Sequence, residues 1–197
     1  LDRYQQVMDA YIRGLQKLAK TNPSKVQDVA SVASFFISRV DSEIDKRLDV
    51  VGTDDALSLR GKAAIAQAKV AYNMFETTFS GEAWRTLAKL GAQVQRPLWA
   101  STSTKNPSYH DTMYVDELIG AHSVNTLPDA TMEAFADHGT VAETIAIDVD
   151  GARSNLRALQ NIGIDMTAVA DQLESEGVAS FQQSFNDLLA VLESKRK

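Results

Sequence analysis

Apolar residues recur at helical spacing over most of the chain. In residues 2–20 the apolar positions fall three or four residues apart, which predicts an amphipathic helix that Asn22-Pro23 ends. Its predicted buried face consists of Tyr4, Val7, Met8, Tyr11 and Leu15. Similar patterns predict further helices over residues 41–48, 55–79, 82–90, 111–118 and 128–137.

The last 50 residues are also helical in pattern. Asp165 is placed to cap the final helix, because a short polar side chain there can accept bonds from the first free backbone N–H groups. One apolar stripe runs along that helix and consists of Val178, Phe181, Phe185, Leu188 and Leu192.

Three short segments have the apolar and β-branched content of strands. They are VASVASFFISRV (29–40), residues 94–101, and AHSVNT (121–126), and each precedes helical sequence. This alternation is typical of parallel βα units, so we predict the α/β class. Parallel strands are normally covered on both faces and belong to larger sheets, often of five or six strands or a closed barrel of eight.

Three strands are too few for such a sheet. If the whole protein is a (β/α)8 barrel of the TIM type, we expect residues 1–197 to supply about the last three strands and the surrounding helices of one barrel domain. The sequence begins in helical pattern at Leu1, without a methionine. We therefore expect it to be the C-terminal part of a longer protein that associates with the remainder.

Composition excludes several classes of protein. The chain has 197 residues, of which 44% are hydrophobic, and it contains no cysteine, so a disulfide framework and thiolate chemistry are excluded. The net charge of −6 argues against general affinity for nucleic acid or anionic membranes, and no apolar run is long enough to span a bilayer. The three histidines show no local metal motif, so we expect no metal site. A cytoplasmic location is compatible with these features.

Polar and basic residues follow the predicted strands. Arg39 ends the first, Ser101-Thr102-Ser103-Thr104-Lys105 follows the second, and Asn125-Thr126 follows the third. Strand ends of parallel units lie together, so the two cations and the hydroxyls predict an anion site, most simply for phosphate. In an alternative interpretation, Arg39 pairs with acidic residues on the following helix, namely Asp41, Glu43 or Asp45, and Lys105 is solvated.

Longer strings carry a family resemblance. SVASFFISRVDSEIDKRLD (31–49), RGKAAIAQAKVAY (60–72), QRPLWASTSTKNPSYHDTMYVDELIG (95–120) and SVNTLPDATMEAFADHG (123–139) resemble the C-terminal half of transaldolase, in its actinobacterial-type branch. The resemblance implies a TIM-type barrel and an enzyme of the pentose phosphate pathway. Such an enzyme transfers a dihydroxyacetone unit from sedoheptulose 7-phosphate to glyceraldehyde 3-phosphate through a lysine Schiff base, without a cofactor.

The resemblance also assigns roles to residues that bind the sugar phosphate. Arg39 would hold the phosphate, Phe36 would form a wall beside the carbon chain, and Ser34 would bond to substrate or water. Ser103 and Lys105 would complete the phosphate pocket, although many family members have Gly-Val in place of Ser103-Thr104.

The catalytic residues of the family fall outside this sequence. Its Schiff-base lysine and its acid/base Asp and Glu lie on earlier strands, so no catalytic residue is expected here and the chain alone should be inactive. We expect Lys105 to stay charged, and Lys62 and Lys69 to be solvated on a helix. Asp137-His138 suits a helix end better than catalysis, and Trp84 and Trp99 suit packing.

Two other functions stay open. The chain could be a non-catalytic or phosphate-binding module, or it could come from a fusion of a transaldolase with a phosphosugar isomerase.

Overall fold

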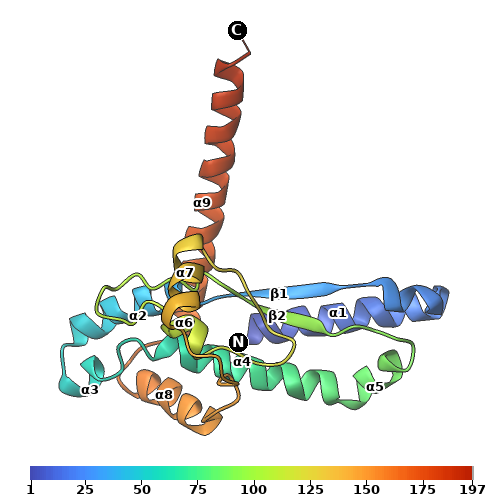
Figure 1. Cartoon of the computed structure of the whole chain (residues 1–197), viewed down its shortest axis with the longest axis horizontal. Coiled ribbons are helices and arrows are strands. Elements are labelled where there is room, and N and C mark those ends of the chain that lie inside the picture. Colours follow the sequence, from blue (N-terminus) through green and yellow to red (C-terminus); the bar gives the residue numbers. More distant parts are fainter. Residues whose placement is uncertain (197) are drawn as a thin grey trace.

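The computed structural model describes residues 1–196 and contains a three-stranded parallel sheet (Figure 1). The strands lie in the order β1 (Ser31–Phe36), β2 (Gln95–Ala100) and β3 (Val124–Asn125). Ser34 is opposite Leu98 in the register, and Leu98 is opposite Val124. The predicted α/β class and the parallel strands are confirmed. In the described residues no helix is both long enough and apolar enough to cross a membrane.

The first strand is shorter than predicted. Residues 29–40 do not form one strand, because β1 ends at Phe36 and helix α2 (Ser38–Val51) begins almost at once. The apolar residues already follow helical spacing from Ile37 on, inside the segment predicted as a strand, and this explains why the helix starts early. Four residues at this spacing are buried on one face of α2: Ile37, Val40, Ile44 and Leu48. Arg39 therefore lies in the first turn of a helix.

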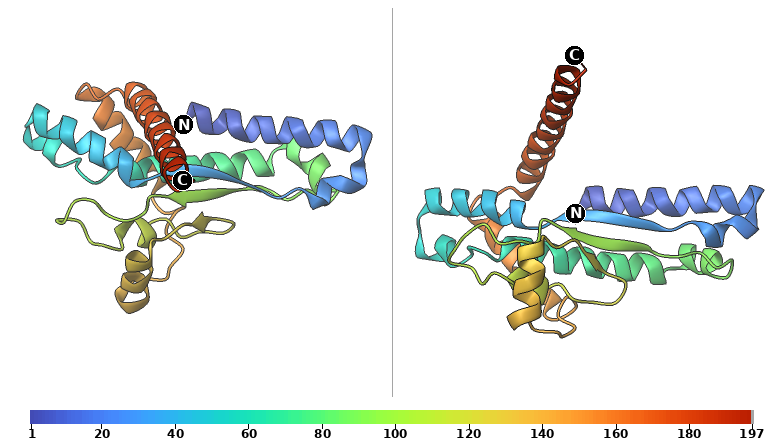
Figure 2. Two further views of the ribbon diagram at one scale, coloured as in Figure 1. Left: turned by 90° about the horizontal axis from the view of Figure 1, so that it is seen from above. Right: turned by 45° about the horizontal axis from the view of Figure 1, so that its top comes forward.

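The core lies on one face of the sheet. Helices α1 (Asp2–Thr21), α4 (Ala63–Ser80) and α5 (Glu82–Ala88) run beside the strands, with the 3-10 helix η1 (Pro23–Asp28) joining α1 to β1 (Figure 2). Tyr4 of α1 meets Phe35 edge-on, with ring centroids 5.5 Å apart, and Phe35 meets the fully buried Trp99 in the same way. Trp84 is also buried, so both tryptophans have the packing role predicted for them.

The other face of the sheet is largely bare. Alternate residues of a strand point to opposite faces, and Val32 and Phe36 on this second face of β1 are 47% and 42% exposed. Parallel sheets are normally buried on both faces, so this exposure is unusual for three such strands.

The predicted helix over 55–79 is interrupted. Residues Asp54–Leu57 form a short α3, and α4 begins only at Ala63. Gly61 between them has a left-handed backbone (φ 70°), and a Cβ atom there would lie 2.9 Å from the ring of Tyr109. Glycine is therefore required both for the turn and for the close approach of that tyrosine.

The prediction that Lys69 is solvated is wrong. Lys69 is only 8% exposed, and its ammonium pairs with Glu117 at 3.0 Å. Helix α4 is covered on several sides, with α8 (Val149–Asn161) packed along it, so even its polar positions are enclosed. Lys62 is exposed, as predicted.

The C-terminal helix α9 (Met166–Ser194) extends away from the rest of the molecule (Figure 1). The carboxylate of Asp165 caps it as predicted, accepting bonds from the N–H groups of Thr167 and Ala168 at 2.8 and 3.3 Å. The predicted stripe is present on α9 but packs against nothing in the described chain, since Phe181 and Phe185 are 70% and 60% exposed.

This division predicts a large effect for one truncation of an apolar side chain and almost none for another. Met8→Ala removes a fully buried side chain and should lower the free energy of unfolding by about 2–5 kcal/mol. Phe181→Ala should change it by less than about 0.5 kcal/mol. Urea denaturation of the 197-residue chain would measure both values, and an equal loss for the two variants would contradict the proposed core.

Candidate functional site

The carboxyl ends of β1 and β2 lie side by side. The ladder between them ends where Ile37 N–H donates to the Ala100 carbonyl and Ser38 N–H donates to the Ser101 carbonyl, both at 2.9 Å. Arg39 and Ser103 follow this junction on its two sides. The two segments that carry the predicted phosphate-binding residues therefore start from the same place in the structure.

On the β1 side the predicted residues face solvent. Ser34, Phe36 and Arg39 are all exposed, and Ser34 and Phe36 point from the bare face of the sheet. The guanidinium carbon of Arg39 lies 5.0 Å from the centroid of the Phe36 ring, a cation–π contact that holds the cation beside the aromatic wall. Near it, a Cβ atom built on Gly177 of α9 would be 3.8 Å from Arg39 Nη1.

On the β2 side a strained turn redirects the chain. Ser101 adopts a left-handed backbone (φ 56°), which is unfavourable for a residue other than glycine. Directly after it, the buried Thr102 hydroxyl donates to Asn125 Oδ1 at 2.7 Å, which ties this turn to the end of β3. Lys105 Nζ then donates to Ser103 Oγ at 2.8 Å, so these two predicted phosphate ligands already lie together.

The end of β3 supports the same junction. Thr126 N–H donates to the Trp99 carbonyl at 3.0 Å, and Pro128 is the residue before helix α7 (Asp129–His138). Residue types alone did not reveal the bonding role of Thr102, since nothing distinguishes it from the three hydroxyl residues around it.

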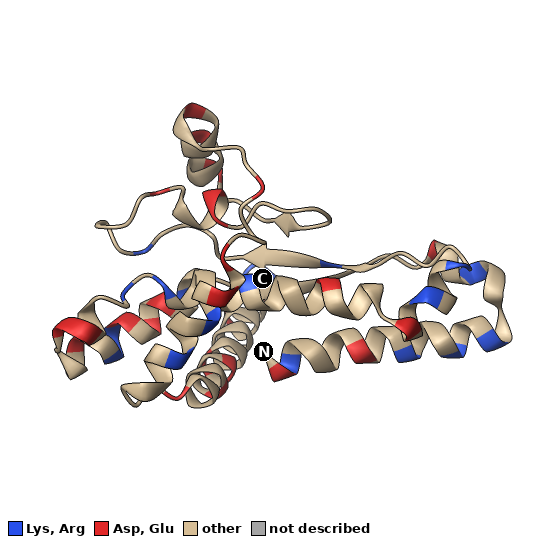
Figure 3. Ribbon diagram, turned by 90° about the horizontal axis from the view of Figure 1, so that it is seen from below, with Lys and Arg blue, Asp and Glu red and all other residues tan. Residues whose placement is uncertain are grey.

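The alternative pairing of Arg39 is wrong. Among residues 1–196 Arg39 makes no ion pair, because the three acids considered for it have other partners. Glu43 pairs with Arg47 at 3.0 Å, while Asp41 and Asp45 accept hydrogen bonds from elsewhere. Lys and Arg are interspersed with Asp and Glu along α2, so this helix presents no broad basic face (Figure 3).

Asp41 is the most deeply buried carboxylate near this junction. It is 1% exposed and accepts bonds from Ala64 N–H at 2.8 Å and from the Tyr114 hydroxyl at 2.7 Å. Burial raises its pKa to about 6, even though both hydrogen bonds act in the opposite direction. Burial and the nearby Asp41 charge also raise the pKa of Tyr114, which therefore stays a donor.

Asp45, one helical turn further along α2, repeats the arrangement. It accepts bonds from Gly61 N–H at 3.1 Å and from the Tyr109 hydroxyl at 2.5 Å. Tyr109 lies in the loop that follows Lys105, and Tyr114 lies in the short helix α6 (Met113–Asp116) beyond it. The two carboxylates therefore fix the loop of Lys105 against the helix of Arg39.

Two of the three histidines come together with Asp111. His110, Asp111 and His138 each offer a ligand atom, and these atoms lie within 4.8 Å of one another, although 27 residues separate Asp111 from His138. His138 is the last residue of α7, as predicted, and its pKa is raised by the carboxylates of Asp111 and Asp137. Sequence spacing could not reveal this cluster, because it depends on how the loop after β2 meets α7.

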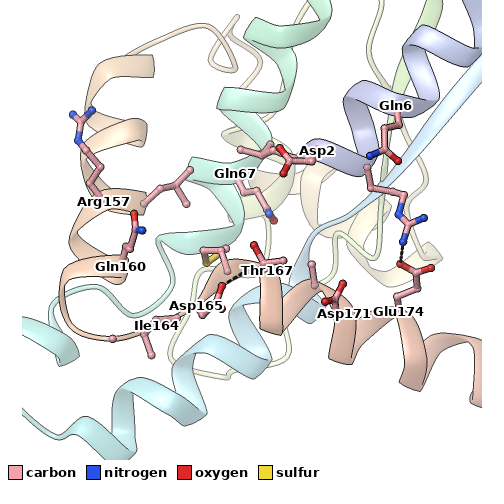
Figure 4. A pocket seen from close by; sticks show the side chains of 16 residues that line it. Asp2, Gln6, Gln67, Arg157, Gln160, Ile164, Asp165, Thr167, Asp171 and Glu174 are labelled. Carbon is pink, nitrogen blue, oxygen red and sulfur yellow. Dashed lines mark hydrogen bonds and ion pairs between the residues drawn. The ribbon is translucent and has the colours of Figure 1, made fainter.

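A separate open cleft of about 920 Å³ lies between α1, α4, α8 and α9 (Figure 4). Gln6 of α1 faces Glu174 of α9 across it. Its charged lining is mainly acidic, with Asp2, Asp165, Asp171 and Glu174 against Arg3 and Arg157, and Arg3 is already paired with Glu174. None of the five predicted substrate-binding residues lines this cleft, and its charge disfavours an anionic substrate.

Comparison with known proteins identifies the family. The sequence profile described as "Transaldolase/Fructose-6-phosphate aldolase" matches residues 1–192. The chain belongs to this family. It is 53% identical to a transaldolase of Parafrankia sp. over 98% of its length, 50% identical to transaldolase 2 of Streptomyces avermitilis over 99%, and 47% identical to a transaldolase of Thermobifida fusca over 96%.

These matches confirm the resemblance to transaldolases of actinobacteria. Membership of this family implies a TIM-barrel-type α/β fold. The chain covers only 52%, 52% and 51% of these three relatives, so it spans about half the length of the transaldolases that it matches.

The burial of Asp41 predicts a pH dependence of stability. Its pKa is about 6 in the folded chain against 3.8 for the free group, so the folded state binds the proton more tightly. This group therefore favours folding at low pH, and its contribution is lost as the pH rises through about 6. From pH 5 to pH 7.5 the loss should be on the order of 1 kcal/mol.

Asp41→Asn should remove this dependence. Denaturation of the chain and the variant at both pH values should give a stability difference that is larger at pH 5, by on the order of 1 kcal/mol. Asp49→Asn, at an exposed position of the same helix, is the matched control. A difference between chain and Asp41→Asn that does not change with pH would contradict this role of Asp41.

Proposed function

We propose that this chain forms the phosphate-binding half of a transaldolase. The complete enzyme transfers a dihydroxyacetone unit from sedoheptulose 7-phosphate to glyceraldehyde 3-phosphate. The observation that carries this proposal is the junction of the β1 and β2 ends in a chain of the transaldolase family. It brings together Arg39, which has no ion pair within residues 1–196, and the Ser103–Lys105 pair.

In this proposal the phosphate binds between the two segments. Arg39 offers a planar fork of N–H donors and Lys105 a mobile point charge, so together they can neutralise a phosphate dianion. Ser103 adds a hydroxyl beside Lys105, Phe36 limits the space next to the carbon chain, and Ser34 bonds to the substrate or to water. Asp41 and Asp45 hold the two segments in position through Tyr114 and Tyr109.

We further propose that the remaining strands of the barrel, with the Schiff-base lysine and the acid/base carboxylates, come from a part of the enzyme outside residues 1–197. The bare face of β1 and the coverage of only half of each relative support this. The buried Lys69 is a poor substitute nucleophile, because its side-chain nitrogen is held by Glu117 at 3.0 Å and is not free to attack a carbonyl.

Complementation tests the proposal directly. The part of the Parafrankia transaldolase that precedes the matched region would be fused in front of Leu1, and formation of erythrose 4-phosphate from the two substrates would be measured. The fusion should be active and the 197-residue chain inactive. Borohydride with the ketose phosphate should trap a lysine of the added part; trapping on Lys69 or Lys105 would contradict the assignment.

Kinetics of variants test the phosphate site within that fusion. Arg39→Ala and Lys105→Ala should each raise KM for the phosphorylated substrates by about 10- to 100-fold, since each removes a charged hydrogen bond to phosphate. Lys46→Ala removes an exposed cation from the same helix as Arg39 and should leave KM unchanged. If an inactive fusion still bound inorganic phosphate through Arg39, the alternative of a non-catalytic phosphate-binding module would be favoured.

A further inference from the structure

The cluster of His110, Asp111 and His138 lies on the surface and outside the phosphate junction. His138 Nε2 is 2.9 Å from Asp111 Oδ1, and the rings of His110 and His138 meet edge-on with centroids 5.5 Å apart. The side chains are 62%, 57% and 40% exposed, in chain order, so an ion can reach them from solvent.

Neighbouring polar groups orient both imidazole rings. Asp137 Oδ2 lies 3.1 Å from His138 Nδ1, which leaves Nε2 directed at Asp111. The Thr112 hydroxyl lies 2.9 Å from His110 Nδ1 and donates its own proton to Asp116 Oδ2 at 2.6 Å. Carboxylate and hydroxyl partners of this kind are typical of histidines that ligate metals, because they hold the ring in place.

The scaffold behind the cluster is also bonded across the two segments. The Asp116 carboxylate accepts a bond from Thr140 N–H at 2.8 Å, and the backbone carbonyl of Asp116 accepts one from the Thr144 hydroxyl. The loop after β2 and the segment after α7 are therefore fixed to each other on the side of α6. This fixes the backbone of the two elements that supply the imidazoles.

We propose that His110, Asp111 and His138 bind one divalent transition-metal ion, with zinc as the reference ion. Two imidazoles and one carboxylate bind zinc, nickel or copper in preference to magnesium or calcium. Water can fill the fourth position around the ion. Metal bonds of about 2.0–2.2 Å place ligand atoms roughly 3.4 Å apart. His138 Nε2 and Asp111 Oδ1 are closer than this, at 2.9 Å, so the ion would replace their hydrogen bond, and the ligand atom of His110 lies within 4.8 Å of both.

Such an ion links the loop that carries Lys105 to the C-terminal end of α7. Two of its ligands follow Lys105 by five and six residues, and the third comes from the helix after β3. The site is thus separate from the phosphate junction and does not depend on the proposed reaction.

Zinc titration of the unmodified chain, without an affinity tag, tests the proposal. The sequence has no cysteine and three histidines, so His122→Ala is a matched control that removes the one histidine outside the cluster. Calorimetry with ZnCl2 at pH 7.5 should give one ion per chain. His110→Ala and His138→Ala should each weaken binding by at least about tenfold, while His122→Ala should bind like the parent chain.

Histidine side-chain NMR supplies a readout that does not depend on the folding of variants. On addition of zinc, the ring nitrogen signals of His110 and His138 should shift and those of His122 should stay. Absence of binding up to about 1 mM zinc, equal binding by the His110→Ala/His138→Ala double variant, or a shift confined to His122 would each overturn the proposal.

Discussion

Two buried carboxylates one turn apart on α2 hold the functional end of this structure together. Asp41 and Asp45 each accept one backbone N–H from the start of α4 or the turn before it and one tyrosine hydroxyl from the segment after β2. Buried carboxylates are stable only when their oxygens are bonded, so these four contacts must form together. They connect three segments that are distant in sequence, and the relative position of Arg39 and Lys105 depends on them.

Helices and strands could be predicted from the sequence where a segment fits only one pattern, either helical or strand-like. The α/β class, the three strands and the cap at Asp165 followed from local patterns. The boundary at Ser38 did not, because residues 29–40 satisfy a strand pattern and the beginning of a helical pattern at the same time. The structure follows the helical pattern from Ser38, with Val40, Ile44 and Leu48 buried on one face of α2.

The residues of the proposed phosphate site could be named from the sequence, whereas the contacts that support them could not. Arg39, Ser103 and Lys105 follow from the rule that parallel strand ends converge, and from the family resemblance. Thr102, Asp41 and the cluster of His110 with His138 depend on contacts between loops whose paths no short pattern describes. The burial of Lys69 could not be predicted either. Helix α4 is buried on several sides, so its sequence has no single apolar face that would separate buried from exposed positions.

The early start of α2 changes the electrostatics at the strand ends. A strand running to residue 40 would present backbone groups that alternate in direction and have little net dipole. Instead the positive end of the dipole of α2 lies at the junction, in the same turn as the guanidinium of Arg39. An anion that approaches this point meets the field of the peptide backbone and the charge of Arg39, with the acidic Asp41 in the same turn acting against both.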